Sequence, residues 1–374
     1  MSVRRVLIVG GGPAGMAAAI AFTRRGIEVL LVEIDTNWAA SGVGLTLLGP
    51  TLRVLDELGV ADDCVHAGFA QDRADFRDAR GELTTVVPFP RVAADRLPPA
   101  VCITRPVFHR VLASHTVDAG VDVRLGVSVA ALEPSDGTAV VDLSDGTRER
   151  FDLVVAADGL HSRIRKLVFA GIPPPVFTGQ AVWRTLVPRP PSLEVYQMFY
   201  GRTAKFGLVP VSEEGLYIFA VQNVGDASRP PQERQAQLMQ ELLDADGDFV
   251  DCVRSAIVDP AEVNYRPTEA MLVPAPWHRG PVVLVGDAAH TTTPHLAFGA
   301  GIAIEDSVVL SEVAAGQQDR EGALERYVGR RYERCRLVVE NSVQLGAWEQ
   351  DPGNPDADPA RLTRESWDAL REPL

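Results

Sequence analysis

The stretch VGGGPAGMAAAIAFTRRGIEVLLVE, Val9 to Glu33, carries the pattern that decides the fold. A short apolar run, residues 6–9, leads into a cluster of glycines, and helix-forming residues then continue to Gly26. A second apolar run follows at residues 28–33. These changes of composition predict a strand, a tight turn, a helix and a second strand.

The glycines of this turn have the spacing of a dinucleotide-binding motif. Gly10, Gly12 and Gly15 form G-x-G-x-x-G, in which the first allows the turn, the second lets a pyrophosphate approach the backbone and the third lets helix and strand pack closely. Glu33, at the end of the second strand, is placed to accept hydrogen bonds from a ribose. An acid there favours an unphosphorylated ribose, as in FAD or NAD.

Charge and hydropathy exclude several other classes of protein. Arg4 and Arg5 ahead of apolar residues resemble the start of an export signal, but the glycines interrupt the run where a signal needs a helical core. No run of about 18 apolar residues is present to span a bilayer. The net charge of −14 disfavours nucleic acid and anionic membranes as partners. The four cysteines are far apart in the sequence, which favours a cytoplasmic location.

Two later segments repeat the pattern of a strand followed by a polar turn. Asp158-Gly159 follows an apolar run at residues 153–157, and Gly286-Asp287 follows another at residues 282–285. Because ligands of open α/β sheets bind at the carboxyl ends of the strands, we expect both turns to lie beside the glycine turn. The alternative is that the two aspartates only cap the helices that follow, and that Arg165 makes a surface ion pair.

With these three motifs in order, residues 3 to about 340 resemble the FAD-dependent aromatic hydroxylases of the para-hydroxybenzoate hydroxylase type. The resemblance implies an α/β fold, in which a Rossmann-like FAD-binding domain with a parallel sheet carries an inserted substrate domain of antiparallel sheet. The expected FAD-binding parts are residues 1–68, 101–175 and 271–320. The expected substrate-domain parts are a hairpin at 69–100 and the strands of 176–270, and residues 321–374 are C-terminal helices.

The resemblance also implies which residues bind FAD. Glu33 and the glycine turn would hold the ADP half, Asp287 the ribityl chain, and Arg105 the ribityl and phosphate region, while Asp158 would support both FAD and a transient nicotinamide nucleotide. The full expected set is Gly10, Gly12, Pro13, Ala14, Gly15, Glu33, Arg105, Asp158, Asp287, Pro294, Gly299, Ala300 and Gly301. One departure is that many relatives have an arginine where this chain reads Trp38-Ala39-Ala40.

Substrate contacts are expected from the antiparallel sheet and from residues 293–298. Tyr217 and His295 are the candidates to bind or deprotonate a substrate hydroxyl, against the alternative of structural hydrogen bonds. Because alternate residues of a strand face opposite sides, the pattern does not decide which apolar candidates face the substrate. The candidates from the sheet are Met198, Tyr200, Phe206, Tyr217 and Phe219.

No metal site is predicted, since His290 and His295 lack further ligands at suitable spacing. The arginines of residues 321–349 are expected on a solvated helix face.

The resemblance implies a monooxygenase that uses NADH or NADPH and O₂. Hydride would pass to the flavin, and a flavin C4a-hydroperoxide would hydroxylate a small electron-rich aromatic or heteroaromatic ring, in a monomer or homodimer. Alternatives are a related flavin enzyme, such as a Baeyer–Villiger oxygenase, a reductase or a halogenase, an ordinary NAD-dependent dehydrogenase, or a non-catalytic flavin-binding redox sensor. The tryptophan signature expected of many flavin halogenases is absent from the sequence.

Overall fold

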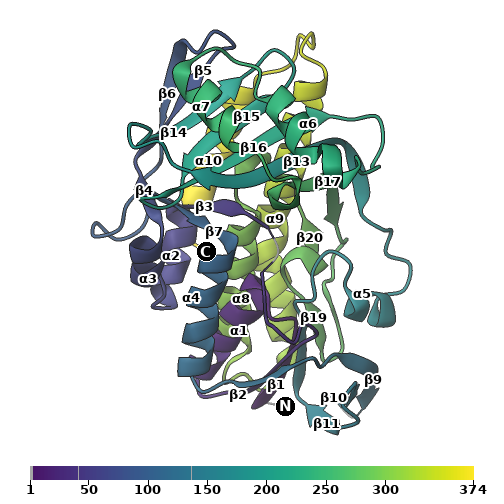
Figure 1. The fold of residues 1–374 in the computed structure, drawn as a ribbon. Helices are drawn as coiled ribbons and strands as arrows, with labels where there is room; N and C mark the ends of the chain where they lie inside the picture. The colour runs from purple at the N-terminus through teal and green to yellow at the C-terminus, as the bar shows by residue number, and fades with distance from the viewer. Residues whose placement is uncertain (1–2, 41, 136) are drawn as a thin grey trace.

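The computed structural model describes residues 3–40, 42–135 and 137–374, so residues 1 and 2 of the first predicted domain lie outside it. Its lower part in Figure 1 is built on a sheet of six strands, five of them parallel. The first strand and the second run side by side, as the opening motif predicts. In spatial order the strands are β18 (His278–Arg279), β19 (Val282–Leu284), β12 (Leu153–Ala156), β1 (Arg5–Val9), β2 (Glu28–Glu33) and β8 (Asp122–Leu125).

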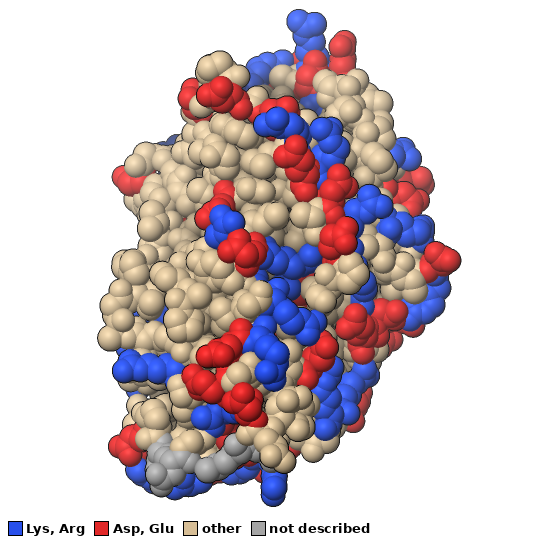
Figure 2. All heavy atoms as spheres, turned by 180° about the vertical axis from the view of Figure 1, so that it is seen from behind, with Lys and Arg blue, Asp and Glu red and all other residues tan. Residues whose placement is uncertain are grey.

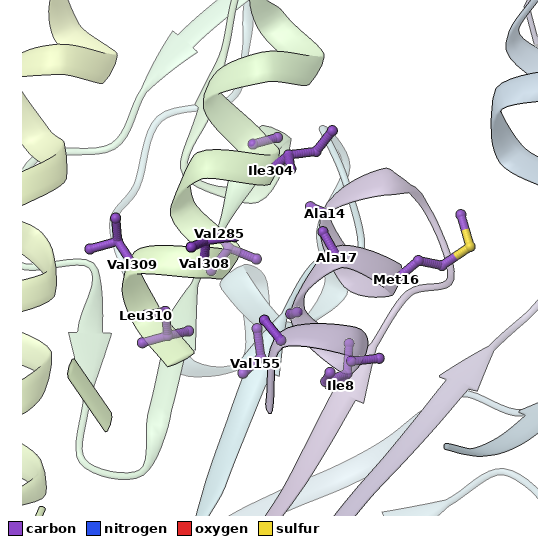
Figure 3. Close-up of a cluster of buried hydrophobic side chains, with 14 of the residues drawn as sticks. Ile8, Ala14, Met16, Ala17, Val155, Val285, Ile304, Val308, Val309 and Leu310 are labelled. Atoms are coloured by element: carbon purple, nitrogen blue, oxygen red, sulfur yellow. The ribbon is translucent and has the colours of Figure 1, made fainter. Parts of the chain in front are cut away.

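Helices pack around this sheet and around one another. The helix of the opening motif, α1, packs against α8, and Figure 3 shows Ala14 and Ala17 of α1 close to Ile304 and Val308 of α8. These side chains are buried, so the two helices, which are far apart in sequence, share one core. The helices are α1 (Pro13–Arg24), α2 (Gly49–Glu57), α3 (Ala61–Ala67), α4 (Arg105–Asp118), α5 (Arg163–Val168), α8 (Gly299–Ala314), α9 (Arg320–Gln350) and α10 (Pro359–Arg371).

The upper part in Figure 1 is an eight-stranded, mostly antiparallel sheet. The strands expected within residues 176–270 and the hairpin expected within residues 69–100 are both present in this sheet. In order the strands are β20 (His290–Thr291), β17 (Asn264–Leu272), β13 (Val176–Pro188), β16 (Gly215–Asn223), β15 (Lys205–Pro210), β14 (Tyr196–Tyr200), β5 (Arg73–Arg77) and β6 (Leu83–Pro88).

Smaller elements complete the fold. Two three-stranded sheets are formed by β3 (Gly44–Leu48), β7 (Ala100–Thr104) and β4 (Phe69–Gln71), and by β11 (Arg148–Phe151), β10 (Thr138–Leu143) and β9 (Val129–Ser135). The remaining helices are α6 (Gln235–Leu242), α7 (Asp248–Ala256) and the short η1 (Gln232–Arg234), η2 (Pro260–Glu262), η3 (Gly286–Ala288) and η4 (Pro294–Leu296).

Strand register separates the large sheet into two different faces. Phe219 pairs with Arg184 on one side and with Gly207 on the other, and cross-strand partners point to the same face of a sheet. By the same pairing Tyr217, Met198, Tyr200 and Lys205 share that face, which we call the site face. The opposite face carries a separate apolar core that α6 and α7 cover.

The strand register decides which alternate residues lie on the same face, a question that the sequence left open. Of the sheet candidates, Met198, Tyr200, Tyr217 and Phe219 lie on the site face. The prediction that Phe206 faces the substrate is wrong. Phe206 pairs with Ala220 and Phe199, is 0% exposed and stacks on the Phe199 ring in the core on the opposite face.

The prediction of a solvated arginine face on the long C-terminal helix is also corrected in part. Arg326 and Arg330 are exposed, but Arg331 is 0% exposed and pairs with Glu305 and Asp306 of α8. The reason is that α9 packs along α8, so one side of α9 is buried.

On the face drawn in Figure 2, basic and acidic side chains lie interspersed, as exposed ion pairs would. Among the described residues, no helix has the length and apolar character needed to cross a membrane.

Candidate active site

The glycine turn between β1 and α1 is shaped by close backbone contact. A Cβ atom on Gly15 would lie 1.9 Å from the carbonyl oxygen of Gly10, so only glycine fits there. The N-cap of α1, Gly12, supplies no side-chain cap, and the helix begins with Pro13 and Ala14. Pro13 has no N–H, so the amides of Ala14 and Gly15 are the first in α1 that are available to an anion, which the positive end of a helix attracts.

Glu33 forms one wall beside this turn. Its Oε2 accepts a hydrogen bond from the amide of Gly11 at 2.6 Å, and its Oε1 accepts one from the amide of Asp35 at 2.8 Å. Each carboxylate oxygen keeps a further lone pair, which can accept from a ribose hydroxyl. The pocket of about 180 Å³ at this place is lined by Gly11, Gly12, Pro13, Glu33, Trp38, Ala39, Ala40, Arg105, Phe108 and His109.

Arg105 lines the same pocket, and Asp287 lies close enough for the two charges to interact. Both residues are exposed to solvent, yet burial by the surrounding protein raises the pKa of Asp287 and lowers the pKa of Arg105. Arg184 lowers the pKa of Arg105 further, whereas Asp287 and Arg105 favour each other's charged form.

Asp158 lies beside the glycine turn but its carboxylate caps a helix. It accepts hydrogen bonds from the hydroxyl of Ser162 at 2.5 Å and from the amides of Arg163 and Ile164 at 2.7 and 3.0 Å. A Cβ on Gly10 would lie 3.0 Å from the Cα of Asp158, so the expected neighbourhood of the two motifs is present. The structure thus shows the capping role, and contact with a cofactor stays a prediction.

Arg165 connects the second motif with the third. Its guanidinium donates to the carbonyl oxygens of Ala288 and Leu160 at 2.8 and 2.6 Å, and the residue is 3% exposed. The alternative of a surface ion pair is therefore wrong for Arg165. Arg165 holds the turn after β12 against the turn after β19.

The loop before α8 is partly exposed to solvent. Pro294 and Ala297 are exposed, and Ala297 has a left-handed backbone with φ of 53°. The helix then begins at Gly299 without a side-chain cap. The amides of Gly299, Ala300 and Gly301 are therefore placed at an uncapped helix N-terminus, which favours negative charge.

Tyr217 contacts the cofactor domain from the sheet. A Cβ on Gly44 would lie 2.5 Å from the Tyr217 ring, so β3 and β16 touch at this residue. Burial raises the pKa of Tyr217, although the positive charge of Arg184 opposes that shift.

His295 belongs to a buried polar network. Its side chain is 1% exposed, its Nδ1 lies 2.9 Å from the hydroxyl of Thr293 and its Nε2 lies 3.1 Å from Glu349. Lys205 of the site face pairs with the same carboxylate. Burial and then Lys205 lower the pKa of His295, so its imidazole is neutral.

A second buried network lies behind the third motif. His290 Nε2 is 2.5 Å from Asp306, and the two form with Cys335 a group whose possible metal-ligand atoms lie within 4.8 Å of one another. Arg331 donates to the same Asp306 at 2.8 Å and to Glu305 at 2.8 Å. Because the guanidinium balances the carboxylate charges, we describe this group as a buried ion network.

Sequence reasoning missed four residues of the site. His109 lies four residues after Arg105, which is the spacing of one helix face, so this signal was available. The sequence analysis noted Trp38 only because many relatives of the family that this chain resembles have an arginine there. Lys205 and Glu349 gave no local signal because 144 residues separate them.

The comparisons with known proteins agree with this arrangement. The family described as "FAD binding domain" matches residues 4–342. YetM of Bacillus subtilis (strain 168) is 30% identical over 99% of this chain and 100% of its own length. The 3-amino-4-hydroxybenzoate 2-monooxygenase PtnB3 of Streptomyces platensis is 30% identical over 94% of this chain and 90% of its own. The solved 2-methyl-3-hydroxypyridine-5-carboxylic acid oxygenase has a TM-score of 0.80 and 25% identity, and the match covers 97% of both chains.

The chain therefore belongs to the FAD-binding-domain family, and its class is that of the FAD-dependent monooxygenases. The residues present fit FAD: uncapped amides of α1 suit its pyrophosphate, Glu33 suits a ribose, and Arg105 adds positive charge to the same pocket.

Proposed function

We propose that the enzyme uses NADH or NADPH and O₂ to hydroxylate a small, electron-rich aromatic or heteroaromatic ring. The observation that carries this proposal is the site face, on which Tyr217, Phe219 and Met198 lie together and where Tyr217 contacts Gly44 of β3. Aromatic and thioether side chains of this kind form good contacts with a planar ring. The 3-amino-4-hydroxybenzoate and hydroxypyridine named for the two relatives are rings of this class.

Bound FAD supplies hydride acceptance and the activation of dioxygen, and the protein supplies binding, orientation and exclusion of water. The uncapped N-terminus of α8 would stabilise negative charge on a group held above it. Arg105 and Arg184 add positive charge at the cleft. These charges favour an anionic or electron-rich substrate oxygen.

Tyr217 is proposed to orient the substrate. Burial raises the pKa of Tyr217 and so keeps its phenol protonated, and the phenol can then donate its hydrogen to a substrate oxygen. For His295 we propose a different role, since both ring nitrogens are engaged and the side chain is enclosed. His295 holds residues 293–298 in place beside the cleft.

The proposal extends to the setting of the enzyme. We propose a cytoplasmic protein that acts as a monomer or homodimer, which light scattering on a size-exclusion column tests directly. The cysteines at 64, 102, 252 and 335 are free thiols, which supports a reducing compartment.

The decisive experiment measures NADH and NADPH oxidation by the FAD-loaded protein in air, with phenolic acids, hydroxypyridines and anilines as test substrates. We expect one ring class to accelerate oxidation and to gain one oxygen atom by mass spectrometry. A ring-expanded or reduced product would instead indicate a Baeyer–Villiger oxygenase or a reductase. Absence of substrate-dependent turnover with every ring class would favour a flavin-binding sensor.

A further inference from the structure

We infer that Trp38 and His109 position the ADP half of FAD by fixing the peptide group between Gly11 and Gly12. The inference rests on the use of FAD by this chain and adds two residues that act on the glycine turn. Neither residue belongs to the glycine motif itself.

Both rings hold the same carbonyl oxygen. The indole Nε1 of Trp38 donates to the carbonyl oxygen of Gly11 at 2.9 Å, and Nε2 of His109 lies 3.2 Å from that oxygen. The two rings meet edge to face, with centroids 5.9 Å apart and planes at 88°. The carbonyl of Gly11 is thus clamped from α4 and from the segment after β2.

The protonation of His109 follows from its partner. Burial lowers the pKa of His109, although its hydrogen bond to Gly11 opposes the shift, so the imidazole is neutral near pH 7. A carbonyl oxygen only accepts, so the single ring hydrogen is on Nε2. His109 therefore acts as a neutral donor and does not add charge beside a phosphate.

The clamp has a consequence for the next amide. In a planar trans peptide the C=O and N–H bonds point in opposite directions, so holding the carbonyl of Gly11 turns the N–H of Gly12 to the other side. Within the described part of the chain, that N–H makes no hydrogen bond. A Cβ atom added to Gly12 would meet no atom within 4 Å, so there is open space at this position. A phosphate oxygen can accept from an amide placed in this way.

Trp38 is itself held in place. Its backbone has φ of 47°, a left-handed conformation that tryptophan rarely adopts. Asp35 accepts hydrogen bonds from the amides of Asn37 and Ala39, both at 2.9 Å, and so builds the turn on which Trp38 stands. The indole also lines the pocket next to Glu33. The turn that Asp35 builds, the carbonyl oxygen that both rings contact and the free amide of Gly12 together point to a positioning role for Trp38 and His109.

The test measures dissociation constants of apoprotein for FAD, ADP and FMN by calorimetry. Trp38→Phe keeps an aromatic ring but removes the indole donor, and we expect FAD and ADP to bind about five- to tenfold more weakly, with FMN unchanged within twofold. His109→Leu should behave in the same way, while His109→Gln, which keeps an N–H donor, should recover part of the affinity. Trp348→Phe, on the partly buried end of α9, is the matched control and should leave all three constants unchanged.

Two results would overturn the inference. If Trp38→Phe and His109→Leu bind ADP and FAD as wild type does, the clamp does not position the ADP half. If ADP and FMN weaken equally, the substitutions loosen the protein and do not act on one half of the cofactor. If the wild-type chain does not bind FAD at all, its use of FAD is overturned. The wild-type titration alone shows this outcome and so separates it from a failure of the clamp.

Discussion

The carboxylate of Glu349 lies 3.1 Å from Nε2 of His295, so the last turn of α9 is fastened to the loop that precedes α8. Lys205 of the site face pairs with the other oxygen of that carboxylate. One side chain therefore joins the loop before α8, the C-terminal helix and the large antiparallel sheet. Glu349 lies beyond residues 4–342, the part that the family matches.

Replacing Glu349 should change how stability depends on pH. Lys205 and His295 outweigh burial and lower the pKa of Glu349 to about 2, from an ordinary 4.5. A lowered carboxylate pKa stabilises the fold above the unfolded value, and this stabilisation is lost as pH falls toward 2. We expect Glu349→Gln to unfold at lower urea than wild type at pH 7, with the difference shrinking between pH 5 and pH 2. Glu340→Gln, at an exposed surface pair, is the control. A difference that stays constant with pH would contradict this interpretation.

Arg331 should contribute far more to stability than a neighbouring arginine of the same helix. Arg331→Met leaves Glu305 and Asp306 buried without their partner, and breaking a buried pair costs about 3–5 kcal/mol. Arg336 forms only exposed pairs, so Arg336→Met should cost about 0–1 kcal/mol. Urea denaturation of both variants measures the two free energies of unfolding. Equal losses would show that the buried network contributes no more than a surface pair.

Asp287→Ala should weaken the flavin half of the cofactor selectively. Loss of a charge-assisted hydrogen bond to the ribityl chain should weaken FAD and FMN by about tenfold or more and leave ADP unchanged. This pattern is the reverse of the one expected for Trp38→Phe, so calorimetry with the same three ligands separates the two halves. Asp356→Ala, in the exposed segment after α9, is the control. Full FAD content with unchanged turnover would show that the third motif does not hold the cofactor.

Two phenylalanines of adjacent strands should have opposite effects. Phe206→Leu acts on the core under α6 and α7, and we expect a loss of about 1–2 kcal/mol in the free energy of unfolding with little change in KM. Phe219→Leu changes the site face, and should alter KM for the aromatic substrate with a smaller loss of stability. Steady-state kinetics and thermal unfolding of both variants are the measurements. The assignment of faces is wrong if Phe206→Leu changes KM as much as Phe219→Leu does.

The parts of the structure that local patterns determine were predictable. The glycine spacing around Gly10 and Gly15 fixes a turn because backbone contact permits no side chain, and that rule applies to any chain. The antiparallel strands were predictable from alternation, but the face that Phe206 occupies depends on strand register and on what α6 and α7 cover.

Long-range contacts account for what the sequence could not show. Asp158 has the residue type of a cofactor ligand and of a helix cap, and only the hydrogen bonds from Ser162, Arg163 and Ile164 show the cap. Arg331 has the spacing of its exposed neighbours, but α8 packs against it. The pairing of His295 with Glu349 joins positions 54 residues apart, for which no local pattern exists.

The two-sided sheet has a consequence for the evolution of this enzyme. Residues that would touch a substrate and residues that hold the sheet to α6 and α7 alternate along the same strands, so a single substitution reaches only one of the two sets. Mutations at positions such as Met198 and Phe219 can therefore be sampled at small cost to folding. A strand of this kind lets descendants of one ancestor acquire new substrates while inheriting an intact scaffold.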